Sequence, residues 1–251
     1  MKSIAFVNEK GGIGKTSICF NTAWEIAKTH KVLMIDLDGQ NANLSYFCNV
    51  KKTDELLTLE DILVKDAKAE DAIVNVKENL DLIPAKTEVA YLTNTAKVSK
   101  MKKMMASFEG KYDYVFVDVN PSPGWHHVLA MSSVKGIVIP SLPDVTSLEA
   151  LTGIAESIEE IQETMNPDLK VLGIVFNRSE KQSNLAKQVN EIAANIAEKR
   201  FGAKVFESKI RSSVRAGETV AAHIGITDYD PKSGVAQDYI QFVQELEAME
   251  V

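Results

Sequence analysis

Short apolar runs alternate with longer amphipathic stretches along the chain. The apolar runs are continuous, which is typical of parallel strands that are covered on both faces. They occupy residues 3–7, 31–36, 80–85, 114–119, 136–140, 170–177 and 203–207. Helix-like stretches lie near residues 15–29, 95–108, 146–164, 182–199 and 234–249. This order predicts an α/β fold with a doubly wound, mostly parallel twisted sheet flanked by helices.

Composition narrows the class of protein. The 251 residues are 45% hydrophobic and 25% charged, contain no Gly/Ser linker or internal repeat, and are expected to form a single domain, 1–251. No apolar run approaches the ~20 residues that cross a bilayer. The two cysteines, Cys19 and Cys48, have no metal-ligand spacing and suit a reducing cytoplasm. A net charge of −7 excludes a uniformly basic protein.

The stretch "NEKGGIGKTS" (8–17) follows the first predicted strand and opens the first predicted helix. In that context glycine-rich backbone forms a nest of N–H groups for anions. Lys15 is placed to reach the β- and γ-phosphates of a nucleotide, and the Thr16 hydroxyl is placed to bind Mg²⁺. The predicted nucleotide-binding residues here are Lys10, Gly11, Gly12, Ile13, Gly14, Lys15, Thr16 and Ser17.

Two other interpretations of this loop are weaker. A plain strand-to-helix turn does not need the Gly-Lys-Thr sequence, and a dinucleotide fingerprint would place glycine where Ser17 stands. The ordinary P-loop pattern has glycine where this chain has Glu9, and it has no counterpart of Lys10.

"KGGIGKT" resembles the deviant Walker A motif of the ParA/MinD family of P-loop ATPases. The resemblance implies ATP and Mg²⁺ as cofactors and a homodimer in the ATP state. It further implies that Lys10 crosses the dimer interface to the partner's phosphates, where a cation offsets charge that develops in the transition state. Lys10, Lys15 and Asp38 are then the expected catalytic residues.

The resemblance continues in "VLMIDLDGQNANLS", which is similar to the family's switch I. It implies that Asp38 orients or activates the attacking water and that Asp36 supports the Mg²⁺ shell, although aspartates also cap turns after strands. Gly39 replaces the usual proline, and Asn43 lies one residue later than in the partition-type pattern.

"YDYVFVDVNPSPG" resembles the Walker B strand and switch II, with Asn120 in place of the first proline of D-x-P-P. The resemblance implies that Asp118 holds an Mg²⁺-bound water. The pair His126–His127 follows; adjacent histidines do not share a helix face, so surface or dimer-contact positions are expected instead of a metal site. Asn177 ends a later strand, where it either contacts the adenine edge or is an ordinary turn residue.

The carboxyl-terminal segment resembles that of small Soj-like partition ATPases, and two features favour this branch. The last residues, "YIQFVQELEAMEV", include acids that anionic lipid would repel, so no membrane partner is expected. The P-loop begins almost at once, so no amino-terminal DNA-reading domain is expected. Residues 171–215 contain nine Lys/Arg against four Glu, a net charge of +5. The candidate DNA contacts are Lys199, Arg200, Lys209, Arg211 and Arg215; solvated helix faces are the alternative.

The sequence therefore predicts a cytoplasmic, nucleoid-associated partition ATPase whose ATP dimer holds non-specific DNA. The resemblance implies a ParB-like centromere-binding partner that stimulates hydrolysis and releases the DNA. Two other functions remain open at this point. One is the positioning of a protein cargo, and the other is delivery of metal clusters, which would need cysteines at a dimer interface.

Overall fold

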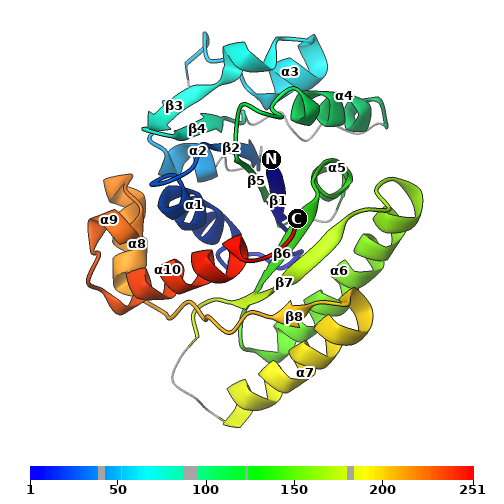
Figure 1. Ribbon diagram of the computed structural model, residues 1–251, viewed down its shortest axis with the longest axis vertical. Coiled ribbons are helices and arrows are strands. Elements are labelled where there is room, and N and C mark those ends of the chain that lie inside the picture. The colour runs from blue at the N-terminus through cyan, green and yellow to red at the C-terminus, as the bar shows by residue number, and fades with distance from the viewer. Residues whose placement is uncertain (39–42, 52, 87–94, 122–123, 180–183) are drawn as a thin grey trace.

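The computed structural model describes residues 1–251 except 39–42, 52, 87–94, 122–123 and 180–183. Its strands are β1 (Lys2–Phe6), β2 (Val32–Leu37), β3 (Val74–Lys77), β4 (Leu80–Ile83), β5 (Tyr114–Val119), β6 (Gly136–Ser141), β7 (Lys170–Phe176) and β8 (Lys204–Val205). They form one sheet in the order β3-β4-β2-β5-β1-β6-β7-β8. The pairing is parallel throughout except between β3 and β4. The predicted doubly wound sheet is confirmed (Figure 1).

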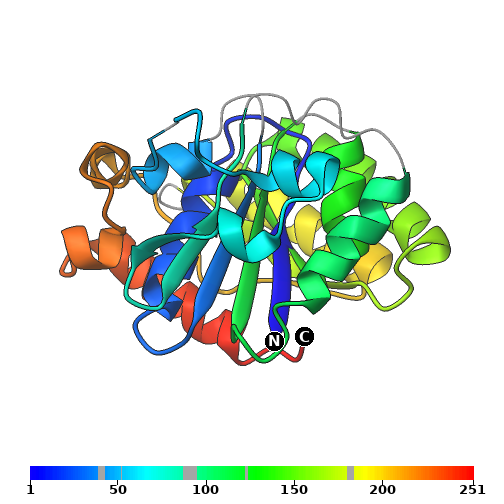
Figure 2. The ribbon, with the colours of Figure 1, turned by 90° about the horizontal axis from the view of Figure 1, so that it is seen from above.

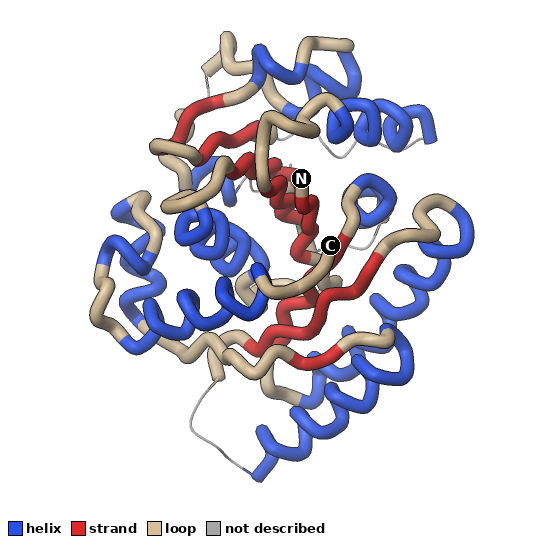
Figure 3. Tube along the Cα trace, viewed as in Figure 1, coloured by secondary structure: helices blue, strands red, loops and turns tan. Residues whose placement is uncertain are grey.

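Helices cover both faces of this sheet (Figures 1 and 3). The helices are α1 (Lys15–Ile26), α2 (Asn43–Phe47), α3 (Leu59–Lys65), the 3-10 turn η1 (Ala69–Ala72), α4 (Thr95–Ala106), α5 (Trp125–Ser133), α6 (Val145–Thr164), α7 (Asn184–Phe201), α8 (Val214–Ala222), α9 (Ile226–Tyr229) and α10 (Gly234–Glu247). One hydrophobic core lies under α1, α2, α9 and α10, and the other lies under α3 to α7.

The continuous apolar runs are explained by these two cores. In β1 and the residue after it, Ile4 and Phe6 belong to the core under α1, whereas Ala5 and Val7 belong to the opposite core. All four are fully buried. Successive strand residues point to opposite faces, so a strand with two covered faces needs apolar residues at every position.

The differences from the predicted elements have simple causes. β3 was not predicted because it lies at the sheet edge, where the half-exposed segment "VNVK" shows no apolar run. β8 covers only Lys204–Val205 of the predicted 203–207. The five predicted helices are present, with ends displaced by a few residues.

The topology brings the functional segments together. β1 pairs with both β5 and β6, and β5 pairs with β2, so the carboxyl ends of β1, β2 and β5 are neighbours. The register places Asp118 beside both Phe6 and Asp36. The two chain ends lie at the other end of the strands, where β1 begins (Figure 2). No helix in the described ranges combines the length and apolar content of a membrane span.

Candidate functional site

The loop between β1 and α1 requires glycine at two positions. Gly12 has φ 72° and Gly14 has φ 92°, in the left-handed region that side chains disfavour. Gly14 also precedes the first residue of α1, and a Cβ at Gly14 would collide with the Asn177 amide nitrogen. The free N–H groups at the start of α1 therefore follow a tight glycine turn, which is the arrangement that binds phosphate.

Asn177 supports this loop from the end of β7. Its Nδ2 donates to the Ile13 carbonyl at 2.7 Å, and its Oδ1 accepts from the Arg178 backbone N–H at 2.9 Å. The side chain is 7% exposed. The structure thus places Asn177 against the phosphate-binding backbone, and its expected contact with adenine stays a prediction.

Lys15 begins α1 and its ammonium lies over the loop. The Nζ donates to the Lys10 carbonyl at 3.1 Å, and the side chain is buried. Burial lowers the pKa of Lys15, while the nearby carboxylates of Asp118 and Asp38 oppose that shift. A desolvated cation at the mouth of an anion nest is strongly attracted to phosphate.

Asp118 carries a buried carboxylate whose oxygens lack hydrogen bonds of ordinary geometry. It is fully buried near the end of β5. Burial and then the neighbouring Asp36 raise the pKa of Asp118 well above its usual range, while the Thr16 hydroxyl and Lys15 oppose the shift. A carboxylate and a hydroxyl facing each other beside a phosphate nest match the oxygen donors that Mg²⁺ prefers.

Asp36 has hydrogen-bond partners within the chain. Its Oδ2 accepts from the Ser45 N–H at 2.9 Å and from the Ser45 Oγ at 2.7 Å, while Oδ1 accepts from the Asp38 N–H at 3.0 Å. Burial raises the pKa of Asp36 to about 6, against the effect of these bonds. The structure therefore shows Asp36 as an anchor for the switch I backbone. Its expected place in the Mg²⁺ shell stays a prediction.

Asp38 lies where the switch I segment leaves β2. Its side chain is 3% exposed, and Asn43 Nδ2 donates to its Oδ2 at 3.3 Å. The displaced Asn43 is thus in contact with the expected water-orienting carboxylate. Gly39, the other departure from the family pattern, lies outside the described residues.

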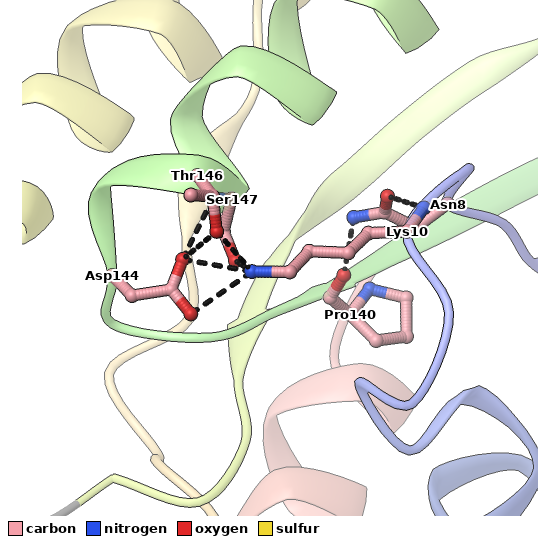
Figure 4. Close-up of polar contacts among 6 residues, drawn as sticks. All are labelled: Asn8, Lys10, Pro140, Asp144, Thr146 and Ser147. Atoms are coloured by element: carbon pink, nitrogen blue, oxygen red, sulfur yellow. Dashed lines mark hydrogen bonds and ion pairs between the residues drawn. The ribbon is translucent and has the colours of Figure 1, made fainter.

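Lys10 points away from its own phosphate loop and toward the start of α6 (Figure 4). Its Nζ lies 2.9 Å from both carboxylate oxygens of Asp144, 2.6 Å from Thr146 Oγ1 and 3.0 Å from Ser147 Oγ. Asp144 is the N-cap of α6 and accepts from the Ser147 N–H at 2.7 Å. Burial would raise the pKa of Asp144, but the hydrogen bonds from Lys10 and Ser147 lower it to about 2.

The backbone that carries Lys10 is also fixed. Asn8 Nδ2 donates to the Pro140 carbonyl at 2.8 Å, and Asn8 Oδ1 accepts from the Lys10 N–H at 2.9 Å (Figure 4). Glu9, which stands where the ordinary P-loop has glycine, accepts from Ser157 Oγ at 3.3 Å. The first part of the loop is therefore docked on β6 and α6, and Lys10 leaves it in a defined direction.

Comparison with known proteins agrees with this geometry. A family model described as an AAA domain matches residues 1–171. Soj, the sporulation initiation inhibitor protein of Bacillus subtilis, is 31% identical over 98% of both chains. The chain belongs to the ParA/MinD family of P-loop ATPases.

Two further members of the family match the chain over nearly its full length. The chromosome partitioning protein ParA of Caulobacter vibrioides is 30% identical over 98% of this chain and 94% of its own. The septum site-determining protein MinD of Pyrococcus horikoshii, solved with Mg-ADP, superposes with a TM-score of 0.79 and 25% identity. That superposition covers 98% of this chain and 96% of MinD.

The expectation for the paired histidines of this ParA/MinD protein is wrong for His127. His127 is 2% exposed, and its Nε2 is 2.9 Å from the Asn120 carbonyl oxygen. The helix α5 starts at Trp125, so its third residue turns inward against the end of β5. His127 is neither a surface residue nor available to a partner subunit.

Several arginines of the basic segment 171–215 are already in ion pairs, so fewer positive charges are available for DNA than the charge count indicates. Arg211 makes a two-pronged ion pair with Asp238 at 2.7 Å, and Arg200 makes a similar pair with Glu159 at 2.9 and 3.1 Å. Arg215 is 3.1 Å from Glu218. These acidic residues lie outside residues 171–215. The fold therefore places negative charges beside the basic segment that its net charge of +5 does not include.

Some contributors to the site were not found from the sequence. Ser45, Asp144 and Asn8 hold Asp36, Lys10 and the loop backbone, respectively. Asn8 directly follows a predicted strand and Asp144 lies four residues beyond another, but many polar residues have such positions, and Ser45 lies nine residues beyond the predicted strand 31–36. Both cysteines are buried, at 0% and 8% exposure, and neither lies at a surface where a subunit could share a metal cluster.

Proposed function

We propose that this chain is a Mg²⁺-dependent ATPase that hydrolyses ATP to ADP and phosphate. The observation that carries the proposal is the fully buried carboxylate of Asp118, which lies beside the Lys15 ammonium and the Thr16 hydroxyl with no hydrogen bond of ordinary geometry to either oxygen. Burial of an unpaired carboxylate is unfavourable unless a cation or its water shell satisfies it. In this proposal the Thr16 hydroxyl would bind Mg²⁺, and the Asp118 carboxylate would hold it through water. The ion would neutralise phosphate charge.

The remaining residues of the site have separate roles. Lys15 neutralises the β- and γ-phosphates, and the N–H groups of residues 11–17 cradle them. Asp38 orients the water that attacks the γ-phosphorus. Asp36 keeps switch I attached to β2 through its bonds to Ser45 and to the Asp38 backbone.

ATP binding and dimerisation are linked in this proposal. Lys10 is directed toward the start of α6 and away from its own loop, and its side chain is 24% exposed. We assign it to the phosphates of a partner subunit. If each nucleotide takes a cation from the neighbouring subunit, ATP stabilises the dimer and the dimer stabilises bound ATP.

The biological role that we propose is DNA partition. Its support is the full-length similarity to Soj and to a chromosome partitioning protein. In the described part of the chain, Lys199 and Lys209 are exposed and have no ion-pair partner. In this role the ATP dimer binds non-specific nucleoid DNA in the cytoplasm, and a ParB-like centromere-binding protein stimulates hydrolysis.

Positioning of a protein cargo is the second candidate. The internal ion pairs of Arg200, Arg211 and Arg215 favour it, because paired guanidinium groups have less to offer to phosphate. The similarity to a septum site-determining protein is a further point in its favour.

Sizing the protein with ATP, with ADP and without nucleotide tests these proposals. Partition predicts dimers with ATP alone, and binding of those dimers to duplex DNA that weakens steeply as salt rises. ATP dimers that do not bind duplex DNA at low salt support cargo positioning. A monomer in Mg-ATP contradicts both.

A further inference from the structure

The paired histidines after β5 surround a residue that departs from the family pattern. Asn120 stands where the family has a proline, and it follows the proposed magnesium residue Asp118 by two positions. Asn120 follows the last residue of β5, and the next residue, Pro121, lies against the phosphate loop, where a Cβ on Gly11 would contact its side chain. Asn120 is 1% exposed.

His127 fixes the backbone of Asn120. The Asn120 carbonyl can only accept, so His127 Nε2 at 2.9 Å is the protonated nitrogen and donates to it. Burial, with Lys15 and His126 adding to it, lowers the pKa of His127 to about 4. His127 is therefore a neutral imidazole with an unprotonated Nδ1.

His126 fixes the Asn120 side chain. The Asn120 Nδ2 lies 3.4 Å from His126 Nδ1, a long hydrogen bond in which the amide donates. With the amide nitrogen toward His126, the amide oxygen faces the other way. The Oδ1 is buried and has no hydrogen-bond partner.

An unpartnered acceptor at this place is unfavourable for the fold. A buried acceptor without a donor costs about 1–3 kcal/mol, and an apolar side chain of similar shape would avoid that cost. Asn120 nevertheless adds a buried acceptor to the turn beside the phosphate loop, two residues from Asp118, whose oxygens make no hydrogen bond of ordinary geometry. Buried acceptors at this end of β5 indicate a place that takes hydrogen-bond donors when the site is loaded.

We propose that Asn120 is a further catalytic residue, whose Oδ1 accepts a hydrogen bond from the attacking water. His127 is a positioning residue that holds the turn from which the Asn120 side chain leaves. The proposal rests on the ATPase function above. The amide takes no proton: as the water oxygen bonds to the γ-phosphorus, the bond to the bridging oxygen breaks, and the water's proton goes to Asp38 or to the released phosphate.

The variant Asn120→Leu tests this role. It removes the acceptor and keeps a side chain of similar size. We expect kcat for ATP to fall about tenfold or more, while KM, the affinity for ATP and the magnesium half-saturation change less than about twofold. The unfolding temperature of the nucleotide-free chain should stay the same or rise, because an unpartnered buried acceptor is gone. A merely structural role predicts the opposite change in stability.

Three further variants test the same role if Asn120→Leu folds poorly. Asn120→Asp retains an acceptor oxygen and should recover part of the lost kcat. His127→Gln retains a donor toward the Asn120 carbonyl and should keep most of the activity, whereas His127→Leu should lose kcat without a loss of ATP affinity.

Three results would overturn the inference. They are an unchanged kcat in Asn120→Leu, a fall in kcat matched by equal losses of ATP affinity and stability, and a shift in magnesium half-saturation without a change in kcat. A wild-type chain that binds ATP and never hydrolyses it overturns the proposed function together with this inference. An active wild type with an equally active Asn120→Leu overturns the inference alone.

Discussion

The Lys10 ammonium lies 2.9 Å from both carboxylate oxygens of Asp144, the N-cap residue of α6. The lysine assigned to a partner's nucleotide is thus held within its own chain. To act across a dimer it must exchange Asp144 for phosphate. The two side chains are 24% and 43% exposed, so the ion pair contributes about 1 kcal/mol or less.

Releasing Lys10 should promote dimerisation. Asp144→Asn removes the charge that holds Lys10 and keeps an N-cap oxygen for the Ser147 N–H. We expect the protein concentration needed for half-dimerisation in ATP to fall about fivefold, as measured by analytical ultracentrifugation. The control is Glu149→Gln, which removes a charge from the same helix at a residue that does not pair with Lys10. An unchanged midpoint in Asp144→Asn argues against competition between Asp144 and the partner's nucleotide.

Substitutions of Lys15 and Asp38 should block different steps, nucleotide binding and ATP hydrolysis, respectively. Lys15→Ala removes the buried cation beside the loop, and we expect nucleotide binding to be lost in isothermal titration calorimetry. Asp38→Ala should still bind ATP and form a long-lived ATP dimer, because binding remains while the water is no longer oriented. Dimers of Asp38→Ala that form equally well without nucleotide would refute this assignment.

Asn177→Ala distinguishes loop support from recognition of adenine. The amide donates to the Ile13 carbonyl in the phosphate-binding loop. If loop support is its role, the affinities for ATP and GTP should fall in parallel, by about fivefold for the loss of one hydrogen bond. A loss confined to ATP would instead identify Asn177 as an adenine contact, and competition binding with both nucleotides measures the difference.

The buried imidazole of His127 should make stability depend on pH. Its pKa is about 4 in the folded chain against the ordinary 6.5, so the unfolded chain binds the proton more tightly. The stabilisation is complete above pH 6.5 and is lost as pH falls through this window to about 4, by about 3 kcal/mol. Chemical denaturation across pH 4–8 measures it. His127→Gln lacks the titrating group, so the stability of the wild type relative to this variant should fall by about 3 kcal/mol between pH 8 and pH 4; a difference that does not change with pH would contradict this account of His127.

The basic residues should separate into DNA contacts and structural residues. Lys209→Glu and Arg215→Glu should fold normally and weaken duplex DNA binding, each lowering the salt slope by about 1. Arg211→Gln should lower the free energy of unfolding by about 1–3 kcal/mol, because Arg211 is paired with a largely buried Asp238. Salt titrations by fluorescence anisotropy give the slopes. Unchanged slopes for Lys209→Glu and Arg215→Glu remove this face from DNA binding.

Local sequence was sufficient for the strands and for the phosphate loop. Continuous apolar runs gave the buried strands, since a strand covered on both faces cannot alternate. Gly12, Gly14 and Lys15 identified the loop because its backbone conformation and charge are properties of consecutive residues. The edge strand β3 was missed because an exposed edge imposes no such pattern.

Only the tertiary structure decided which side chains meet. His127 is buried against Asn120, Lys10 is held by Asp144 far along the chain, and three arginines of the basic segment are paired. Hydrogen bonds and ion pairs act over a few ångströms in space, whatever the separation along the chain. The sequence determined the buried strands, five of the helices and the phosphate loop, which follow from local pattern; the partners of each charged group depended on how the elements pack.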